Sequence, residues 1–202
     1  VKVFGIARNV DGLPFPAAAC DVASYDGLKA VARQLRKEGA QVAGLVNAAG
    51  IASMNLAITT PAEVIEKIIH TNLLGTIYAC QQFAPIIMRR KAGAIVNFST
   101  IAVALGLKGE SIYAASKAGV EGFTRAFARE MADFNVTVNC IAPGPIATAL
   151  LAGVTSTQIS KIVSQQVLPR RIEAALPNAA LSDLYDAQYA RFCALSAAAN
   201  GK

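Results

Sequence analysis

The stretch that decides the fold reads Gly93-Ala94-Ile95-Val96-Asn97-Phe98-Ser99-Thr100, and Tyr113-Ala114-Ala115-Ser116-Lys117 follows it after a loop. Residues 94–98 are short, apolar and preceded by a glycine, which predicts a buried strand, whereas the apolar periodicity from Tyr113 onward predicts a helix. Tyr113 and Lys117 are four residues apart, so a helix stacks them on one face about 6 Å apart along its axis. An adjacent cation lowers the pKa of a phenol, which makes a tyrosine useful as an acid or base near neutral pH. For this pair alone, a half-buried tyrosine beside an extended lysine is the plain structural alternative.

The composition predicts one globular domain. The chain has 202 residues, of which 54% are hydrophobic and 16% charged, enough to bury one sizeable core. No apolar run approaches the roughly 18 residues of a membrane span, and no charged-then-apolar signal pattern opens the sequence, so we expect a cytoplasmic protein without a membrane partner. The four cysteines are far apart and form no C-x-x-C pair, so we expect neither a disulfide framework nor a metal site.

The net charge of +6 does not indicate a nucleic-acid partner. Lysine and arginine are scattered, and the one tight cluster, Arg89-Arg90-Lys91, stands where a predicted helix ends. Cations at that position favour the helix dipole. We therefore predict no binding of nucleic acid.

Strand and helix patterns alternate along the chain. Strands are predicted at residues 2–7 and 17–20, and buried strands at 42–46, 94–98 and 136–141. Helices are predicted at 24–38, at 61–90 and from Tyr113 onward. Further helical periodicity follows at residues 159–167 and 181–192. Such alternation predicts βαβ units and an α/β, doubly wound parallel sheet with helices on both faces. Ligands in such folds bind at the carboxyl ends of the strands, where the polar motifs of this chain fall.

Several of these motifs together resemble the short-chain dehydrogenase/reductase family over residues 1–171. They are Leu45-Val46-Asn47-Ala48-Ala49-Gly50, Thr71-Asn72-Leu73-Leu74-Gly75, Ser99-Thr100, Tyr113-x-x-x-Lys117 and Val138-Asn139-Cys140-Ile141-Ala142-Pro143-Gly144. The resemblance implies a single dinucleotide-binding catalytic domain over residues 1–202. It also implies an oxidoreductase that moves hydride between a nicotinamide and a carbonyl or secondary alcohol, similar to 3-oxoacyl-thioester reductases and dihydrodiol-type dehydrogenases.

The catalytic roles carried over from this resemblance fall on four residues. Tyr113 is expected to transfer the proton, Lys117 to lower the pKa of Tyr113 and bind the nicotinamide ribose, and Thr100 to hold the substrate oxygen. Asn72 is expected to support a water relay from a local bend in its helix. The alternative for Asn72 is a helix residue hydrogen-bonded within its own turn. His70, the only histidine, is predicted to be structural or exposed.

The predicted cofactor is NADP(H) rather than NAD(H). The tip of the first strand carries Ala7 and Arg8, and an arginine there accommodates a 2′-phosphate whereas an acidic residue binds the 2′-hydroxyl. Arg8 as a solvated loop charge, or Asp11 reaching the ribose, are the alternatives. The resemblance implies further cofactor contacts at Asp21 and Val22 beside the adenine, at Asn47, Ala48 and Gly50, at Tyr113 and Lys117, and at Pro143, Gly144, Ile146 and Thr148 beside the nicotinamide.

Two departures from the family pattern stand out. Thr100 occupies the position of the family's catalytic serine; it keeps the hydroxyl but adds a methyl group and stiffens χ1. Ser99 is adjacent, but alternation along a strand turns it to the other side.

The sequence also opens at a strand like the family's second, with no glycine-rich turn before it. We expect a strand, a glycine loop and a helix to precede Val1, and a strand to follow Lys202, in the natural polypeptide. An intact mass of 21.0 kDa together with direct pairing of residues 2–7 with 42–46 would contradict this.

Two other functions and one mode of assembly complete the predictions. A non-catalytic binding or assembly subunit is the alternative that the missing glycine loop and Thr100 favour. A nucleotide-sugar epimerase fits poorly, because the C-terminal part is short for a substrate domain. Helices Ala62–Arg90 and Ile112–Asp133 carry more apolar residues than one buried face requires, which predicts a homodimer or homotetramer.

Overall fold

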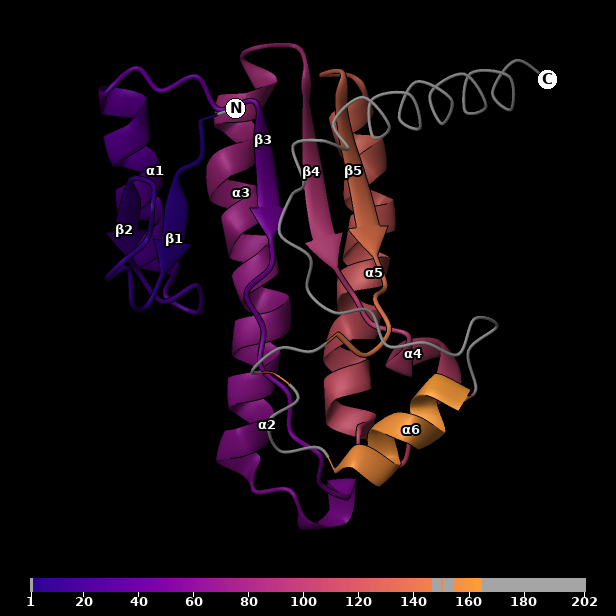
Figure 1. Ribbon diagram of the computed structural model, residues 1–202. Helices are drawn as coiled ribbons and strands as arrows, with labels where there is room; N and C mark the ends of the chain where they lie inside the picture. The colour runs from indigo at the N-terminus through magenta and orange to yellow at the C-terminus, as the bar shows by residue number, and fades with distance from the viewer. Residues whose placement is uncertain (1, 147–149, 151–154, 165–202) are drawn as a thin grey trace, which may run out of the picture.

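A computed structural model describes residues 2–146, 150 and 155–164. Its centre is a three-stranded parallel sheet in the order β3 (Gly44–Asn47), β4 (Gly93–Phe98) and β5 (Val136–Ile141) (Figure 1). The register places Asn47 beside Asn97, and Asn97 beside Cys140. The three strands therefore end level with one another, at one edge of the sheet.

A separate parallel pair is formed by β1 (Gly5–Ala7) and β2 (Ala17–Ala19). Both strands are shorter than the sequence patterns suggest, and no helix connects them. Instead the ring of Phe15 closes over β1: a Cβ placed on Gly5 would lie only 2.8 Å from that ring. In the described part of the chain, β1 is not hydrogen-bonded to β3. Val46 in β3 is 64% exposed.

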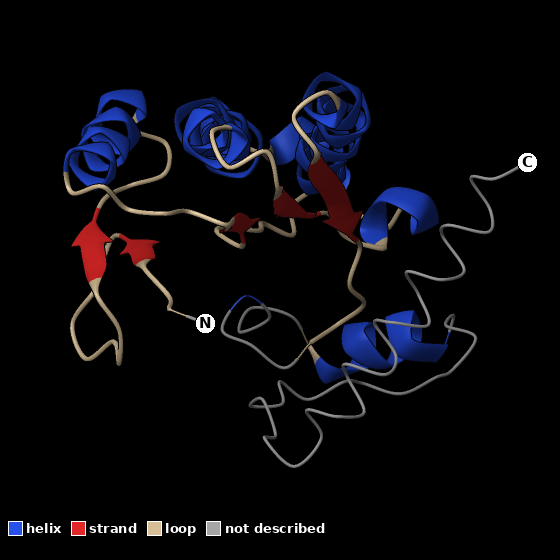
Figure 2. Cartoon of the chain, turned by 90° about the horizontal axis from the view of Figure 1, so that it is seen from above, coloured by secondary structure: helices blue, strands red, loops and turns tan. Residues whose placement is uncertain are grey.

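The long helices form one layer. α1 (Tyr25–Lys37), α3 (Gly75–Met88) and α5 (Ser111–Ala132) lie side by side on the same face of the strands, and α6 (Ser156–Ser164) lies on the other side (Figure 2). The predicted α/β arrangement of parallel strands and helices is confirmed. The periodicity predicted for residues 165–167 and 181–192 lies outside the described residues.

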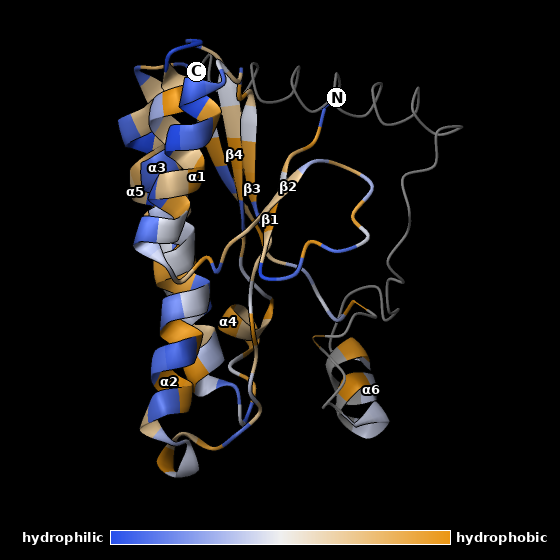
Figure 3. Ribbon diagram, turned by 90° about the vertical axis from the view of Figure 1, so that its left-hand side faces the viewer, coloured by the Kyte–Doolittle hydropathy of each residue, from blue (hydrophilic) through white to orange (hydrophobic). Residues whose placement is uncertain are grey.

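The predicted helix over residues 61–90 is interrupted. It consists of α2 (Ala62–Ile69), a π-helical turn (His70–Leu74) and α3. Hydrophilic and hydrophobic bands alternate along α2, which buries Ile68 and exposes Glu63, Glu66 and Lys67 (Figure 3). Short elements, η1 (Ala57–Thr59) and α4 (Ala102–Leu105), lie in the loops that follow β3 and β4.

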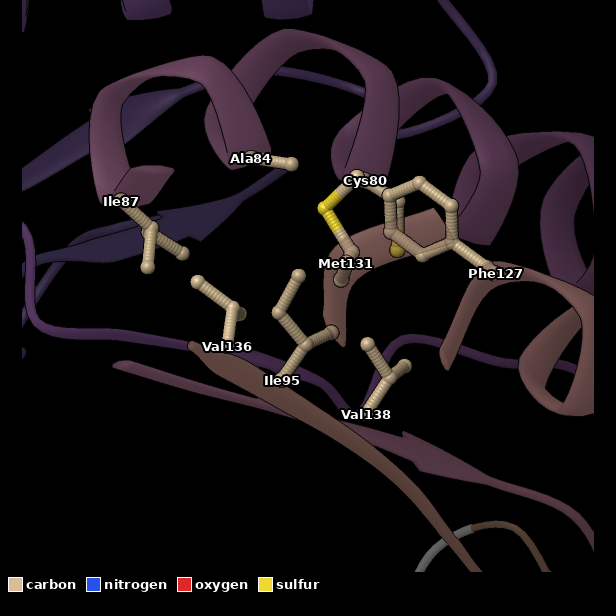
Figure 4. Packing of buried hydrophobic residues seen from close by; sticks show 8 residues of the cluster. All are labelled: Cys80, Ala84, Ile87, Ile95, Phe127, Met131, Val136 and Val138. Carbon is tan, nitrogen blue, oxygen red and sulfur yellow. The ribbon is translucent and has the colours of Figure 1, made fainter. Parts of the chain in front are cut away.

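Helix α3 packs on two sides, which accounts for its apolar sequence. One core cluster joins α3 to β4, β5 and α5 through Cys80, Ala84, Ile87, Ile95, Phe127, Met131, Val136 and Val138 (Figure 4). A second joins α3 to α1 through Leu28, Val31, Ala32, Leu35, Ala79, Phe83 and Ile86. Much of the apolar surface that predicts an oligomer is therefore already buried within one chain, and the oligomer stays a prediction.

Two further findings concern the cysteines and the helices of the described residues. Cys20, Cys80 and Cys140 are free thiols; Cys193 lies outside the described residues. No helix in the described part is both long and apolar enough to cross a membrane.

Candidate active site

The carboxyl end of β4 meets the N-terminal half of α5, and this junction brings the predicted catalytic residues together. The Lys117 Nζ donates a hydrogen bond to the Phe98 carbonyl at 2.8 Å. Tyr113, one turn earlier on α5, is 8% exposed and Lys117 is 5% exposed. Thr100 follows the strand; its Oγ1 accepts from the Ala102 N–H at 3.2 Å, and it hydrogen-bonds the phenol of Tyr113. A phenol, an ammonium and a hydroxyl thus share one half-enclosed site.

The electrostatics of this site differ from the sequence prediction. Burial raises the pKa of Tyr113; the hydrogen bond from Thr100 lowers it in part, and the Glu110 carboxylate raises it. Burial also lowers the pKa of Lys117, because an ammonium loses hydration there. The predicted lowering of the Tyr113 pKa by Lys117 is not observed in this structure: the Lys117 ammonium is bonded to the Phe98 carbonyl, and desolvation of the phenol is the largest effect. Tyr113 is therefore protonated at neutral pH.

Asn72 lies in the π-helical turn and is fully buried. Its Oδ1 accepts from the Ile51 N–H at 2.8 Å, and its Nδ2 donates to the Ile51 carbonyl at 2.9 Å and to the Ser116 Oγ at 3.0 Å. The side chain thus joins the loop after β3 to α5 and does not bond within its own turn. A Cβ on Gly50 would lie 3.4 Å from Asn72 Oδ1 and 3.5 Å from Lys117 Nζ. The local irregularity expected at Asn72 is present as the π turn, a feature frequent at functional sites.

A buried polar chain runs beneath the site across the strands. The Asn47 Nδ2 donates to Asn97 Oδ1 at 2.8 Å and to the Cys80 Sγ at 3.3 Å, and the Asn97 Nδ2 donates to Thr124 Oγ1 at 2.9 Å. These bonds link β3, β4, α3 and α5. Asn97 and Thr124 were not predicted. An asparagine inside the apolar run of residues 94–98 was the signal available for Asn97.

The residues predicted to contact a dinucleotide also follow the strands. Arg8 is exposed just after β1, and Asp21 and Val22 follow β2. The Asp21 Oδ1 accepts from the Ala23 N–H at 2.9 Å, and a Cβ on Gly75 would lie 3.0 Å from Val22 Cγ2. Ala48 and Gly50 follow β3. That these residues contact a dinucleotide stays a prediction; a glycine-rich pyrophosphate loop is not among the described residues.

The nicotinamide-side residues follow β5. The Pro143 carbonyl accepts from the Ile101 N–H at 3.1 Å, which ties this loop to the one carrying Thr100. Gly144 and Ile146 come next, and Thr148 lies outside the described residues. His70 is exposed, with its Nδ1 2.9 Å from the Glu66 carbonyl. Within the described residues no group of three or more side chains is arranged to hold a metal ion.

Parallel α/β sheets bind ligands at the carboxyl ends of their strands, and here that edge carries the buried Tyr113 and Lys117. The fold is therefore of the ligand-binding α/β class, and comparison with known proteins identifies its family. The short chain dehydrogenase family model matches residues 6–159. The chain belongs to the short-chain dehydrogenase family.

The relatives are longer than this chain. Carbonyl reductase family member 4 of Danio rerio is 38% identical over 147 residues, which are 73% of this chain and 62% of that protein. The 3-oxoacyl-[acyl-carrier-protein] reductase of Homo sapiens is 34% identical over 179 residues, 84% of this chain and 76% of that protein. The ligand-free aldohexose dehydrogenase of Thermoplasma acidophilum has a TM-score of 0.75 at 28% identity, covering 85% of this chain and 72% of that one.

Proposed function

We propose that this chain is the catalytic part of an NADP(H)-dependent reductase of small carbonyl compounds, which also oxidises the corresponding secondary alcohols. The observation that carries the proposal is the burial of Tyr113, Lys117 and the Thr100 hydroxyl together at the carboxyl end of β4. The names of the human and zebrafish relatives, both reductases, support it.

The chemistry assigned to the chain concerns the substrate oxygen. A nicotinamide cofactor, when bound beside Tyr113 and Lys117, would supply the hydride for the carbonyl carbon. The Tyr113 hydroxyl and the Thr100 hydroxyl hydrogen-bond the carbonyl oxygen, and Tyr113 gives that oxygen its proton. The raised pKa of Tyr113 keeps the phenol protonated at neutral pH, as a general acid requires. This favours reduction at neutral pH, and oxidation gains as the pH approaches the pKa of Tyr113. Lys117 is assigned to the nicotinamide ribose and Asn72 to a water relay behind it.

Arg8 supports the choice of NADP(H). Its guanidinium is exposed at the end of β1 and has no ion-pair partner in the part of the chain that the structure describes. An arginine at this position pairs with a 2′-phosphate. We expect Arg8→Ala to raise the KM for NADPH about tenfold while leaving the KM for NADH within about twofold. Asp11→Ala is the matched control; if it alone changes the preference between the cofactors, Asp11 reaches the ribose instead.

The partners and place of the protein are part of the same proposal. We propose a small carbonyl or alcohol substrate, a homodimer or homotetramer built on α2, α3 and α5, and a cytoplasmic location. Equilibrium sedimentation of the chain at micromolar concentration tests the assembly, because a monomeric mass contradicts it.

The decisive experiment is Tyr113→Phe, which removes one hydroxyl and keeps the ring. We expect turnover to fall at least 10²-fold, since general acid catalysis contributes that much, with little change in the unfolding midpoint. Fluorescence titration with NADPH separates binding from turnover: because only the hydroxyl of one cofactor contact is lost, the Kd should change far less than the turnover. Retention of more than about a tenth of the activity would refute the proton-transfer role. NADPH binding by the parent without turnover of any carbonyl would favour the non-catalytic alternative.

A further inference from the structure

The acidic residue Glu121 faces the junction of β4 and α5 but is not one of the proposed catalytic residues. Glu121 lies one turn after Lys117 on α5, and its Oε1 accepts a hydrogen bond from the Ser99 hydroxyl at 2.6 Å. Ser99 is 4% exposed. A short hydrogen bond from a hydroxyl to a carboxylate is among the strong ones in proteins. The Oε2 of Glu121 faces Arg125 at 3.7 Å, but Arg125 is 72% exposed, so that ion pair contributes little.

Ser99 stands between two groups that hold the proposed catalytic residues. On one side is Phe98, whose carbonyl binds the Lys117 Nζ, and on the other is Thr100, whose hydroxyl bonds Tyr113. β4 ends at Phe98, so residues 99 and 100 lie outside its ladder. The Ser99 N–H donates to the Ile141 carbonyl at 2.7 Å, which ties this segment to β5. The Ser99 hydroxyl ties the same segment to α5, the helix that carries Tyr113 and Lys117.

We propose that Glu121 is a positioning residue of the active site: by accepting the Ser99 hydrogen bond, it holds the Phe98 carbonyl against Lys117 and the Thr100 hydroxyl against Tyr113. The inference rests on the proposed function, because it assigns Glu121 to the proton-transfer geometry of that site. The printed contacts of Glu121 are the Ser99 hydroxyl and Arg125, so its assigned role acts through Ser99.

The two partners of Glu121 give matched variants in the full chain. Glu121→Ala and Ser99→Ala each remove the short bond, Glu121→Gln keeps an acceptor for Ser99, and Arg125→Ala removes only the exposed ion pair. We expect the first two to lower kcat about tenfold or more with the KM for NADPH within about threefold, because small displacements of catalytic groups are costly. The Ser99→Ala/Glu121→Ala double variant should lose no more than either single one. Glu121→Gln should stay within about threefold of the parent, and Arg125→Ala should be unchanged.

A second readout does not depend on turnover. Because the Thr100 hydrogen bond lowers the pKa of Tyr113, loosening Thr100 in Ser99→Ala should move the Tyr113 titration to higher pH. Ultraviolet absorbance of tyrosinate measures this, with Tyr113→Phe subtracted to isolate the one phenol; Glu110 and Lys117, the charged groups near it, are retained in every protein. A residue that only stabilises the fold would lower the unfolding midpoint and leave this titration in place.

The outcomes separate the two proposals. An unmoved Tyr113 titration in Ser99→Ala, or a kcat in both alanine variants within twofold of the parent, overturns the positioning role even where Tyr113→Phe abolishes turnover. If Tyr113→Phe keeps its activity, the proposed function fails, and a shifted titration still supports the placement of Thr100 by Glu121. If Glu121→Ala does not fold, Ser99→Ala and Glu121→Gln decide in the same way.

Discussion

Replacing Asn72 by alanine tests how far the π turn depends on one side chain. The fully buried amide makes three hydrogen bonds, two to the Ile51 backbone and one to the Ser116 hydroxyl. Each such bond contributes about 1 kcal/mol net, and a buried group left without a partner costs more. Ile51 is only half-buried, so water can replace part of what it loses. We therefore expect Asn72→Ala to lower the free energy of unfolding by about 3 kcal/mol, a large part of a typical ~5–15 kcal/mol.

Urea unfolding followed by circular dichroism measures this loss, provided that the slope of free energy against urea is unchanged. Ser116→Ala is the control: Asn72 keeps its two bonds to Ile51 and loses only the one to Ser116. The variant also removes the bond that the Ser116 hydroxyl donates to the Tyr113 carbonyl, so we expect a loss of about 1–2 kcal/mol. In the double variant the shared bond should appear as a coupling of about 1 kcal/mol. A loss below about 1 kcal/mol in Asn72→Ala, or equal losses in both single variants, would refute the reasoning.

Three further changes probe other parts of the structure. Thr100→Ser keeps the hydroxyl without the methyl group and should leave activity equal or higher; collapse of activity would give Thr100 another role. Gly93→Ala places a Cβ against Ile87 and 2.9 Å from the Ala43 carbonyl, and should lower the free energy of unfolding by ~1–3 kcal/mol, whereas Gly122→Ala meets nothing within 4 Å and should not. Burial raises the pKa of the Cys80 thiol from 9.0 to about 12. The buried, protonated thiol therefore stabilises the folded state fully below pH 9, and the free energy of unfolding declines by about 1 kcal/mol per pH unit as the pH rises toward 12. Urea unfolding across this pH range should show the decline in the parent and not in Cys80→Ser.

The sequence by itself determined the features that depend on neighbours along the chain. Alternating apolar runs and amphipathic segments predicted the strands and helices, and helical periodicity predicted that Tyr113 and Lys117 share a face. Because parallel strands end at one edge, the same patterns located the site. Periodicity placed the strand ends less accurately, because they depend on pairing partners. It did not reveal the break inside residues 61–90, where only the family resemblance indicated a bend at Asn72.

Only the tertiary structure decided how the side chains of the site are partnered and charged. Asn72 joins residues 51 and 116, Asn97 joins residues 47 and 124, and Ser99 joins Glu121. These contacts cross large separations in sequence, so no local pattern contains them. The pKa of Tyr113 also depends on residues distant in sequence. The four-residue spacing predicts a nearby cation, but burial sets the direction of the pKa shift, and burial depends on everything packed around the phenol.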